Sequence, residues 1–199
     1  MHHCEPASIA ACPSSAPATA SRSLQTGLLP AVGQAAGGAS RPLSTPPQPP
    51  TPTIALAPNI AGRFIDDWLE VEVVPDSPCI WTAGLSDEPT STSCILPIAH
   101  GEGRFITDND TLTAIESAGL VALRYTESSN VNGSMNRIAG ICDPTGLIFG
   151  LMPHPERFTT WHQHPAWTRL DRNMITETEP IGLRMFRNAV AHARSACVR

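Results

Sequence analysis

The chain has 199 residues, 41% of them apolar, and a formal net charge of −5, so it is long enough for one domain with a sizeable core. All 13 basic residues are arginines scattered along the sequence, which does not favour nucleic-acid binding, and the lack of lysine excludes Schiff-base chemistry and a P-loop lysine. No stretch approaches the roughly 18 apolar residues of a membrane span, and the amino terminus has no signal-peptide pattern. We therefore expect a cytoplasmic protein with no membrane contact, whose six cysteines are reduced.

Composition divides the chain into two unlike parts. Residues 1–58 contain 11 of the 20 prolines and only three charged side chains. Such a segment buries too little apolar surface to offset its ordering entropy. We expect residues 1–55 to be a disordered or spurious low-complexity segment, and residues 56–199 to be the C-terminal part of one folded domain.

The folded part begins with two predicted strands. Residues 67–74 alternate, with Leu69, Val71 and Val73 on one face and glutamates on the other, which indicates a half-buried strand. Residues 95–99 form a second apolar run. The segment that follows it, from residue 100 to residue 104, contains two glycines and is expected to form a tight loop at the strand end.

The remaining predicted elements alternate between helices and strands. A helix is expected from Asp108, a capping residue, to the residue before Gly119. A β-hairpin or a pair of closely coupled strands is expected where the Asp-Pro-Thr-Gly turn at 143–146 joins two apolar runs. A terminal amphipathic helix is indicated by apolar residues four apart, with Ile181, Met185, Ala189 and Ala193 on one stripe and Phe186 and Val190 beside it. These elements span residues 108–118 (helix), 120–125 (strand), 138–142 and 147–151 (hairpin) and 180–196 (helix).

The segment most informative about chemistry is Gly-Leu-Met-Pro-His-Pro-Glu-Arg, residues 150–157. A histidine acts as a general base for a weak nucleophile when a third group fixes its tautomer, as the acid does in a catalytic triad. His154 and Glu156 are two residues apart, so in extended backbone, which the flanking prolines favour, their side chains would project from the same side. The pair is a candidate base with its orienting carboxylate.

This octet resembles the C-terminal signature of class I glutamine amidotransferases, in particular the glutaminase subunits of phosphoribosylformylglycinamidine synthases. Three further segments carry the same resemblance in the same order along the chain. They are Leu-Ala-Pro-Asn with Gly-Arg-Phe at 56–64, Pro-Ile-Ala-His-Gly-Glu-Gly-Arg-Phe at 97–105, and Asn-Gly-Ser with Ile-Ala-Gly-Ile-Cys at 132–142.

The resemblance implies an α/β fold, a flavodoxin-like open sheet that is incomplete at the amino end. It implies that His154 is the catalytic base and acid, that Glu156 orients it, and that Ala99, His100 and Gly101 lie near the glutamine-binding loop. It also implies hydrolysis of glutamine to supply ammonia for an ATP-dependent amidation in purine biosynthesis. The implied partner is a large synthetase subunit, which would hold ATP and magnesium, with a small accessory subunit as a further candidate. No cofactor is expected on this chain.

The chain departs from the family at the nucleophile. Family members carry it in a Gly-x-Cys-Asn-Gly-x-Gln turn, which no segment of this sequence matches. The closest cysteine, Cys12, is followed by Pro13, which would obstruct the helix after the turn. No nucleophile is therefore identifiable; we expect the chain to be inactive alone, a truncated or frame-shifted relative. The alternative is a non-catalytic protein that docks onto the synthetase subunit.

A metal site is not expected either. His162 and His164 flank one glutamine, but the sequence has no second cluster at the spacing of known zinc patterns. We therefore predict no metal ligands in this chain.

Overall fold

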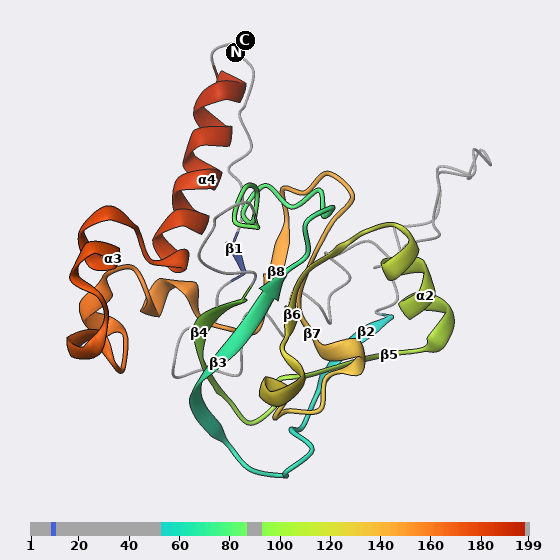
Figure 1. Ribbon diagram of the computed structural model, residues 1–199. Helices are drawn as coiled ribbons and strands as arrows, with labels where there is room; N and C mark the ends of the chain where they lie inside the picture. Colours follow the sequence, from blue (N-terminus) through green and yellow to red (C-terminus); the bar gives the residue numbers. More distant parts are fainter. Residues whose placement is uncertain (1–8, 11–52, 87–92, 198–199) are drawn as a thin grey trace.

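The computed structural model describes residues 9–10, 53–86 and 93–197 (Figure 1). In that part of the chain the strands form two sheets, and the larger one has the order β1-β8-β7-β6-β3-β4. Its strands are β1 (Ile9–Ala10), β8 (Phe149–Leu151), β7 (Ile138–Cys142), β6 (Val121–Tyr125), β3 (Ile65–Val73) and β4 (Ser93–His100). The smaller sheet pairs β2 (Ile54–Ala57) with β5 (Arg104–Thr107).

Helices accompany these sheets, so the predicted α/β class is confirmed. The α-helices are α2 (Asn109–Ser117), α3 (Arg172–Glu177) and α4 (Ile181–Cys197). Figure 1 places α2 and α3 on opposite sides of the strands, with α4 extending away from them. In the described sheet only β1 and β8 run parallel, while the other neighbours are antiparallel.

Most predicted elements lie where the sequence patterns put them. Strand β3 buries Leu69, Val71 and Val73 as its alternation predicts. Helix α2 begins after Asp108, whose side chain accepts a hydrogen bond from the Thr111 amide, and ends before a glycine with positive φ. The predicted hairpin is the antiparallel pair β7 and β8.

The terminal helix differs from its prediction at its outer end. Ile181, Met185 and Ala189 are buried, but Val190 is 50% exposed and Ala193 is also exposed. The reason is that α4 contacts the body mainly through its first turns, against strand β4 and the short 3-10 turn η3 (Pro155–Arg157), and then projects beyond them (Figure 1). Apolar spacing alone does not indicate where the body ends.

The sequence patterns do not predict strands β1, β2 and β5 or helix α3. Strands β2 and β5 have four residues each, too short for a clear period, and they pair with each other across a long stretch of sequence. Helix α3 has only six residues. Strand β2 begins at Ile54, close to the predicted boundary at residue 56. The segment 1–55, predicted to be disordered or spurious, contains strand β1, which pairs with β8, but most of that segment lies outside the described residues.

Buried apolar side chains form two clusters that share the central strands. The first surrounds the larger sheet and includes Leu96 and Leu123, and the second lies between that sheet and the β2–β5 pair and includes Phe105 and Ile138. Strands β6 and β7 contribute residues to both clusters, so the described body has a continuous interior. No helix in the described ranges is long and apolar enough to span a bilayer.

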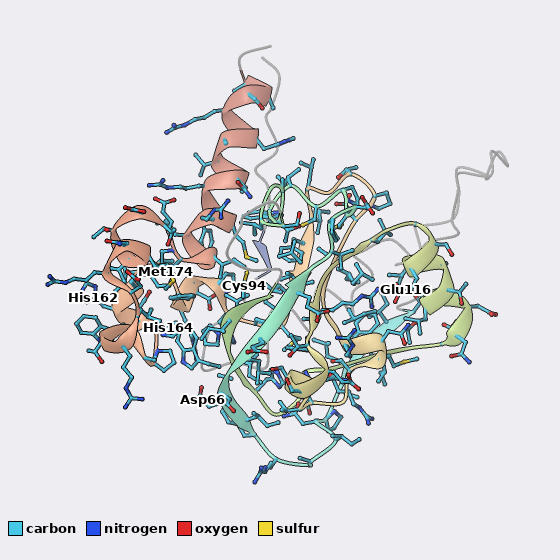
Figure 2. The ribbon with its side chains drawn as sticks, in the orientation of Figure 1. Asp66, Cys94, Glu116, His162, His164 and Met174 are labelled. Atoms are coloured by element: carbon cyan, nitrogen blue, oxygen red, sulfur yellow. The ribbon has the colours of Figure 1, made fainter. Side chains whose placement is uncertain are left out.

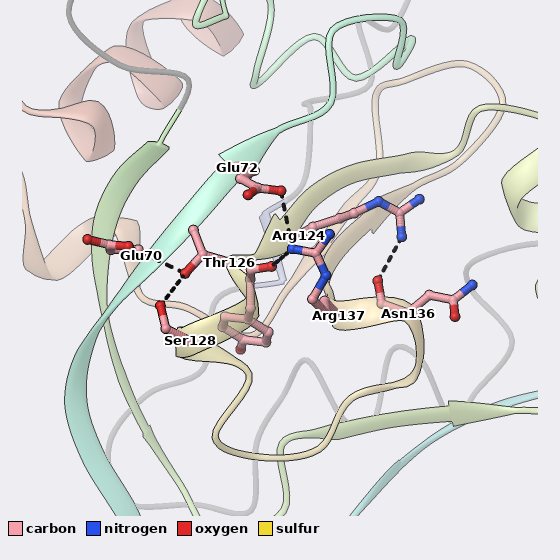
Figure 3. A network of polar contacts seen from close by, with 8 residues as sticks. Glu70, Glu72, Arg124, Thr126, Ser128, Asn136 and Arg137 are labelled. Atoms are coloured by element: carbon pink, nitrogen blue, oxygen red, sulfur yellow. Dashed lines mark hydrogen bonds and ion pairs between the residues drawn. The ribbon is translucent and has the colours of Figure 1, made fainter.

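An arginine-supported corner joins η2 (Met135–Arg137) to β7. Asn136 and Arg137 have φ of 46° and 59°, in the left-handed region that non-glycine residues rarely adopt. Arg124 donates a 2.8 Å hydrogen bond to the Asn136 carbonyl, and Arg137 donates to the Tyr125 carbonyl and pairs with Glu72 (Figure 3). These contacts from β6 and β3 hold a backbone conformation that the local sequence does not favour.

Candidate functional site

The end of β8 delivers His154 to the edge of the larger sheet. After β8 the chain is held by a hydrogen bond from the Met152 amide to the Ala139 carbonyl, 3.0 Å, on strand β7. The His154 amide then donates to the Pro97 carbonyl on β4, 2.7 Å. Backbone contacts to two strands therefore fix the position of His154, whose side chain is 3% exposed.

The structure brings the two predicted catalytic residues together. Nδ1 of His154 lies 2.7 Å from Oε1 of Glu156. The backbone, however, is not extended as expected: Pro155, Glu156 and Arg157 form the 3-10 turn η3, closed by a hydrogen bond from the Phe158 amide to the Pro155 carbonyl. Proline at the first position explains the turn, because its fixed φ suits a helical start.

The charge of Glu156 is supported by its neighbours. Burial alone would raise the pKa of this carboxyl, but the hydrogen bond from His154 and its own backbone amide, with the charges of His154 and Arg157, lower the pKa below its usual value. Glu156 is therefore the ionised acceptor of the pair, and the Nδ1 hydrogen of His154 points at it. The Nε2 atom of His154 is then the one that can take a proton.

A second histidine, His100, lies beside this pair at the end of β4. Its side chain is buried, and its pKa is lowered to about 4, first by burial and then by the charge of His154. The ring packs directly over Gly103, where an added Cβ would lie 2.2 Å from ring carbon Cε1. The lowered pKa makes His100 a neutral imidazole at physiological pH. The ring lies so close to the backbone of residue 103 that a larger residue there would force it to move.

The other two residues predicted for the glutamine loop have structural roles here. Ala99 pairs with Asp66 in the β3–β4 ladder. Gly101 follows the strand, and its carbonyl accepts a hydrogen bond from the Asn59 amide, 2.9 Å. Both residues thus shape the backbone that carries His100.

Sequence reasoning misses the buried polar residues behind His100. The Asn59 side chain contacts His100 and Gly103, while Asn132 donates to the Gly103 carbonyl, 2.9 Å, and accepts from Ser134. Asn59, Asn132 and Ser134 are all buried, Asn132 completely. The available signal is that both asparagines belong to the segments that carry the family resemblance.

Four cysteines lie in the described part of the chain, and Cys94, on β4, is the one that is partly buried. Cys79 and Cys142 are buried and hydrogen-bond to each other, and that bond together with burial raises the pKa of Cys79. Cys197 lies in the last turn of α4. Cys12 lies outside the described residues, although β1, two residues before it in sequence, pairs in parallel with β8.

The closely spaced histidines His162 and His164 contact aromatic rings. His164 packs among Trp68, Phe158 and Trp161, with ring centroids 5.7 to 6.4 Å apart, and His162 lies 4.7 Å from Trp167. Figure 2 shows both histidines in the segment before α3, on the side of the molecule away from Glu116. Among the described residues no group of three or more potential metal ligands gathers.

Comparison with known proteins gives a consistent result. The model of the CobB/CobQ-like glutamine amidotransferase domain matches residues 43–193. The phosphoribosylformylglycinamidine synthase subunit PurQ of Dehalococcoides mccartyi is 36% identical over 150 residues, which cover 71% of this chain and 53% of the relative. The PurQ of Synechococcus sp. strain JA-3-3Ab is 46% identical over 104 residues, covering 52% of this chain and 44% of the relative.

A solved structure, "Structure of PurLQS from Thermotoga maritima", is 30% identical, with a TM-score of 0.45, and the match covers 69% of this chain and 52% of that one. The chain spans about half the length of the curated relatives it matches. The family resemblance predicted from the octet and its companion segments is confirmed by the family match. The chain belongs to the CobB/CobQ-like glutamine amidotransferase family.

Proposed function

We propose that this chain contributes the histidine and carboxylate of a glutamine-hydrolysing site in a phosphoribosylformylglycinamidine synthase. The site would release ammonia from glutamine for the ATP-dependent amidation of formylglycinamide ribonucleotide. The observation that carries the proposal is the 2.7 Å contact between Nδ1 of the buried His154 and Oε1 of the partly exposed Glu156, just after a strand end. The names of the PurQ relatives support the choice of reaction.

In this proposal each residue has one role. In a complete site of this family, which has the cysteine turn that this sequence lacks, His154 would take the proton of the cysteine thiol at Nε2, and the thiolate would attack the side-chain amide carbon of glutamine. The carbon–nitrogen bond breaks, and His154 returns the proton to the departing ammonia. Water then hydrolyses the thioester to glutamate and regenerates the thiol. Glu156 keeps the Nδ1 hydrogen in place and offsets the positive charge of the ring while it holds the extra proton.

The partner and the missing nucleophile belong to the same proposal. We place ATP and magnesium on a large synthetase subunit, no cofactor on this chain, and the assembly in the cytoplasm. Because the sequence lacks the Gly-x-Cys-Asn-Gly-x-Gln turn, we propose that this chain alone does not hydrolyse glutamine. Loss of the nucleophile from a catalytic triad lowers kcat by on the order of 10⁶ in subtilisin, and a loss of that size would leave no turnover that a routine assay detects.

Two measurements on the full chain test the proposal. The first mixes it with the large synthetase subunit of a relative and follows complex formation by analytical ultracentrifugation, with glutamine binding followed by the histidine NMR signals. We expect a complex, and movement of the His154 signals on adding glutamine. A chain that binds neither the subunit nor glutamine would contradict the proposed function.

The second measurement is ammonia release from glutamine, with and without the synthetase subunit, together with labelling by a glutamine-like electrophile and mass-spectrometric mapping of all six cysteines. We expect neither turnover nor a labelled cysteine. Turnover that the His154→Gln variant abolishes would overturn the proposed inactivity and would support the catalytic role of His154. A complex without glutamine binding would favour the docking protein.

A further inference from the structure

The buried side chain of Asn59 is fully engaged with the backbone around His100. Its Nδ2 donates to the Arg63 carbonyl, 2.9 Å, and to the His100 carbonyl, 2.8 Å. Its Oδ1 accepts from the Gly103 amide, 3.2 Å, and lies 3.0 Å from His100 Nδ1. Both hydrogens of the amide and its oxygen thus have partners, and Asn59 is 2% exposed.

These partners determine the orientation of the amide. Two carbonyls can accept only from the nitrogen of Asn59, and the Gly103 amide can donate only to its oxygen. The atom facing His100 Nδ1 is therefore an acceptor, so Nδ1 must carry the hydrogen. In a neutral imidazole the second nitrogen, Nε2, is then bare and can only accept.

That bare nitrogen is buried. Nε2 of His100 has no hydrogen-bond partner among the described residues, and the residue is 6% exposed. Leaving a buried acceptor unpaired is unfavourable, so such a group calls for a functional role or for a bound molecule that completes the contact. His100 ends strand β4, and the Pro97 carbonyl of the same strand accepts the 2.7 Å hydrogen bond from the His154 amide, so β4 holds His100 near the proposed catalytic histidine.

We infer that Asn59 is a positioning residue that holds His100 in the Nδ1–H tautomer, so that the bare Nε2 accepts a hydrogen bond from an N–H group of the bound substrate. The substrate class is a compound with a primary amide or an ammonium group, as glutamine has. This inference rests on the proposed function for the identity of the ligand, but its first half, the tautomer, does not depend on any ligand.

The tautomer is tested on the full chain labelled with ¹⁵N-histidine, by long-range ¹⁵N–¹H NMR. We expect a protonated Nδ1 and a bare Nε2 for His100 in the wild type. In the Asn59→Ala variant we expect loss of that single tautomer. A wild-type His100 protonated at Nε2 overturns the inference, as does a folded Asn59→Ala protein with an unchanged tautomer. If Asn59→Ala does not fold, the tautomer of His100 in the wild type decides.

The ligand half is tested by adding glutamine to the same samples. We expect the His100 Nε2 signal to shift, the signals of the exposed His192 on α4 to stay in place, and the His100→Phe variant to bind glutamine about tenfold more weakly. Glutamine that moves His154 and leaves His100 unchanged refutes this inference alone. Failure of glutamine to bind at all refutes the proposed function and the ligand half together, while the ligand-free tautomer stands as measured.

Discussion

At the scale of single residues, the site depends on a histidine whose environment disfavours its charge. The ordinary pKa of 6.5 falls to about 4 in His100, because the ring is buried and because His154 is its neighbour. The folded chain therefore binds fewer protons at this position than the unfolded chain does whenever the pH lies between those two values. His100 contributes nothing to the pH dependence of stability above that window.

We predict from this that the chain loses stability as the pH falls from about 6.5 to about 4. The difference in pKa corresponds to about 3 kcal/mol of unfolding free energy, with no further loss from this group below the window. Urea unfolding at pH 7.5, 5.5 and 4 measures the slope, and the His100→Gln variant, which does not titrate, should have a shallower one. Equal slopes in the two proteins would show that another group is responsible.

Some residues of the candidate site can be predicted from the sequence and others cannot. His154 and Glu156 can be found because both belong to one short segment with an unusual pattern. The role of Asn59 cannot be found, because its contact with His100 joins residues 41 positions apart and depends on how two loops meet. A local sequence pattern can reveal two catalytic residues of the same turn, whereas the tautomer of His100 is set by tertiary contacts.

At the scale of elements, helix α4 supports the turn that carries His154 and Glu156. Gly182, in its first turn, packs so closely against η3 that an added Cβ would lie 2.1 Å from the Pro155 carbonyl oxygen and 2.4 Å from that of Phe158. Backbone atoms cannot move aside as a flexible side chain can. The close approach of helix and turn therefore requires glycine.

We predict that Gly182→Ala destabilises the chain by about 1–3 kcal/mol, because the helix and the turn must separate to admit the methyl group. The same variant should perturb the His154 NMR signals. Ala193→Gly, in the exposed outer part of α4, is the matched control and should cost at most about 1 kcal/mol and leave His154 unchanged. Thermal unfolding and histidine spectra of both variants measure this. Unperturbed His154 signals in a folded Gly182→Ala protein would count against the supporting role of α4.

The predictability of the elements follows their length. Strand β3 and helix α2 have enough residues for a period or a complete set of caps, and these signals predict both of them. The four-residue strands β2 and β5 have no such signal, since their pairing is set by the second apolar cluster. The apolar spacing of α4 predicts a longer buried face than the structure has. The outer turns of the helix extend beyond β4 and η3, so their apolar residues are exposed.

At the scale of the whole molecule, the two apolar clusters meet in strands β6 and β7. Unfolding one cluster would remove strands from the other, so we expect the described body to unfold as one unit. The α/β class follows from the alternation of strand and helix signals. The strand order and the antiparallel pairing of the described sheet do not follow from these signals, because local patterns do not show which strands become neighbours or in which direction each one runs.

We predict that Leu123→Ala, in the first cluster, and Phe105→Ala, in the second, both shift one common transition. Each should lower the unfolding free energy by about 2–5 kcal/mol through the cavity that it leaves. Tryptophan fluorescence and far-ultraviolet circular dichroism should give coincident curves, even though Trp68 and Trp81 belong to or pack against the first cluster only. Separate transitions for the two probes in Phe105→Ala would mean that the clusters unfold independently.

The corner at Asn136 and Arg137 also has a consequence for the order of folding. The left-handed backbone costs about 1–2 kcal/mol at each residue, and contacts from β6 and β3 offset that cost. Since β3 and β6 are far apart in sequence, the corner cannot be stable before these strands have paired. The corner therefore forms late in folding. Slow hydrogen exchange of the backbone amides next to Asn136 and Arg137 would show that the sheet has assembled.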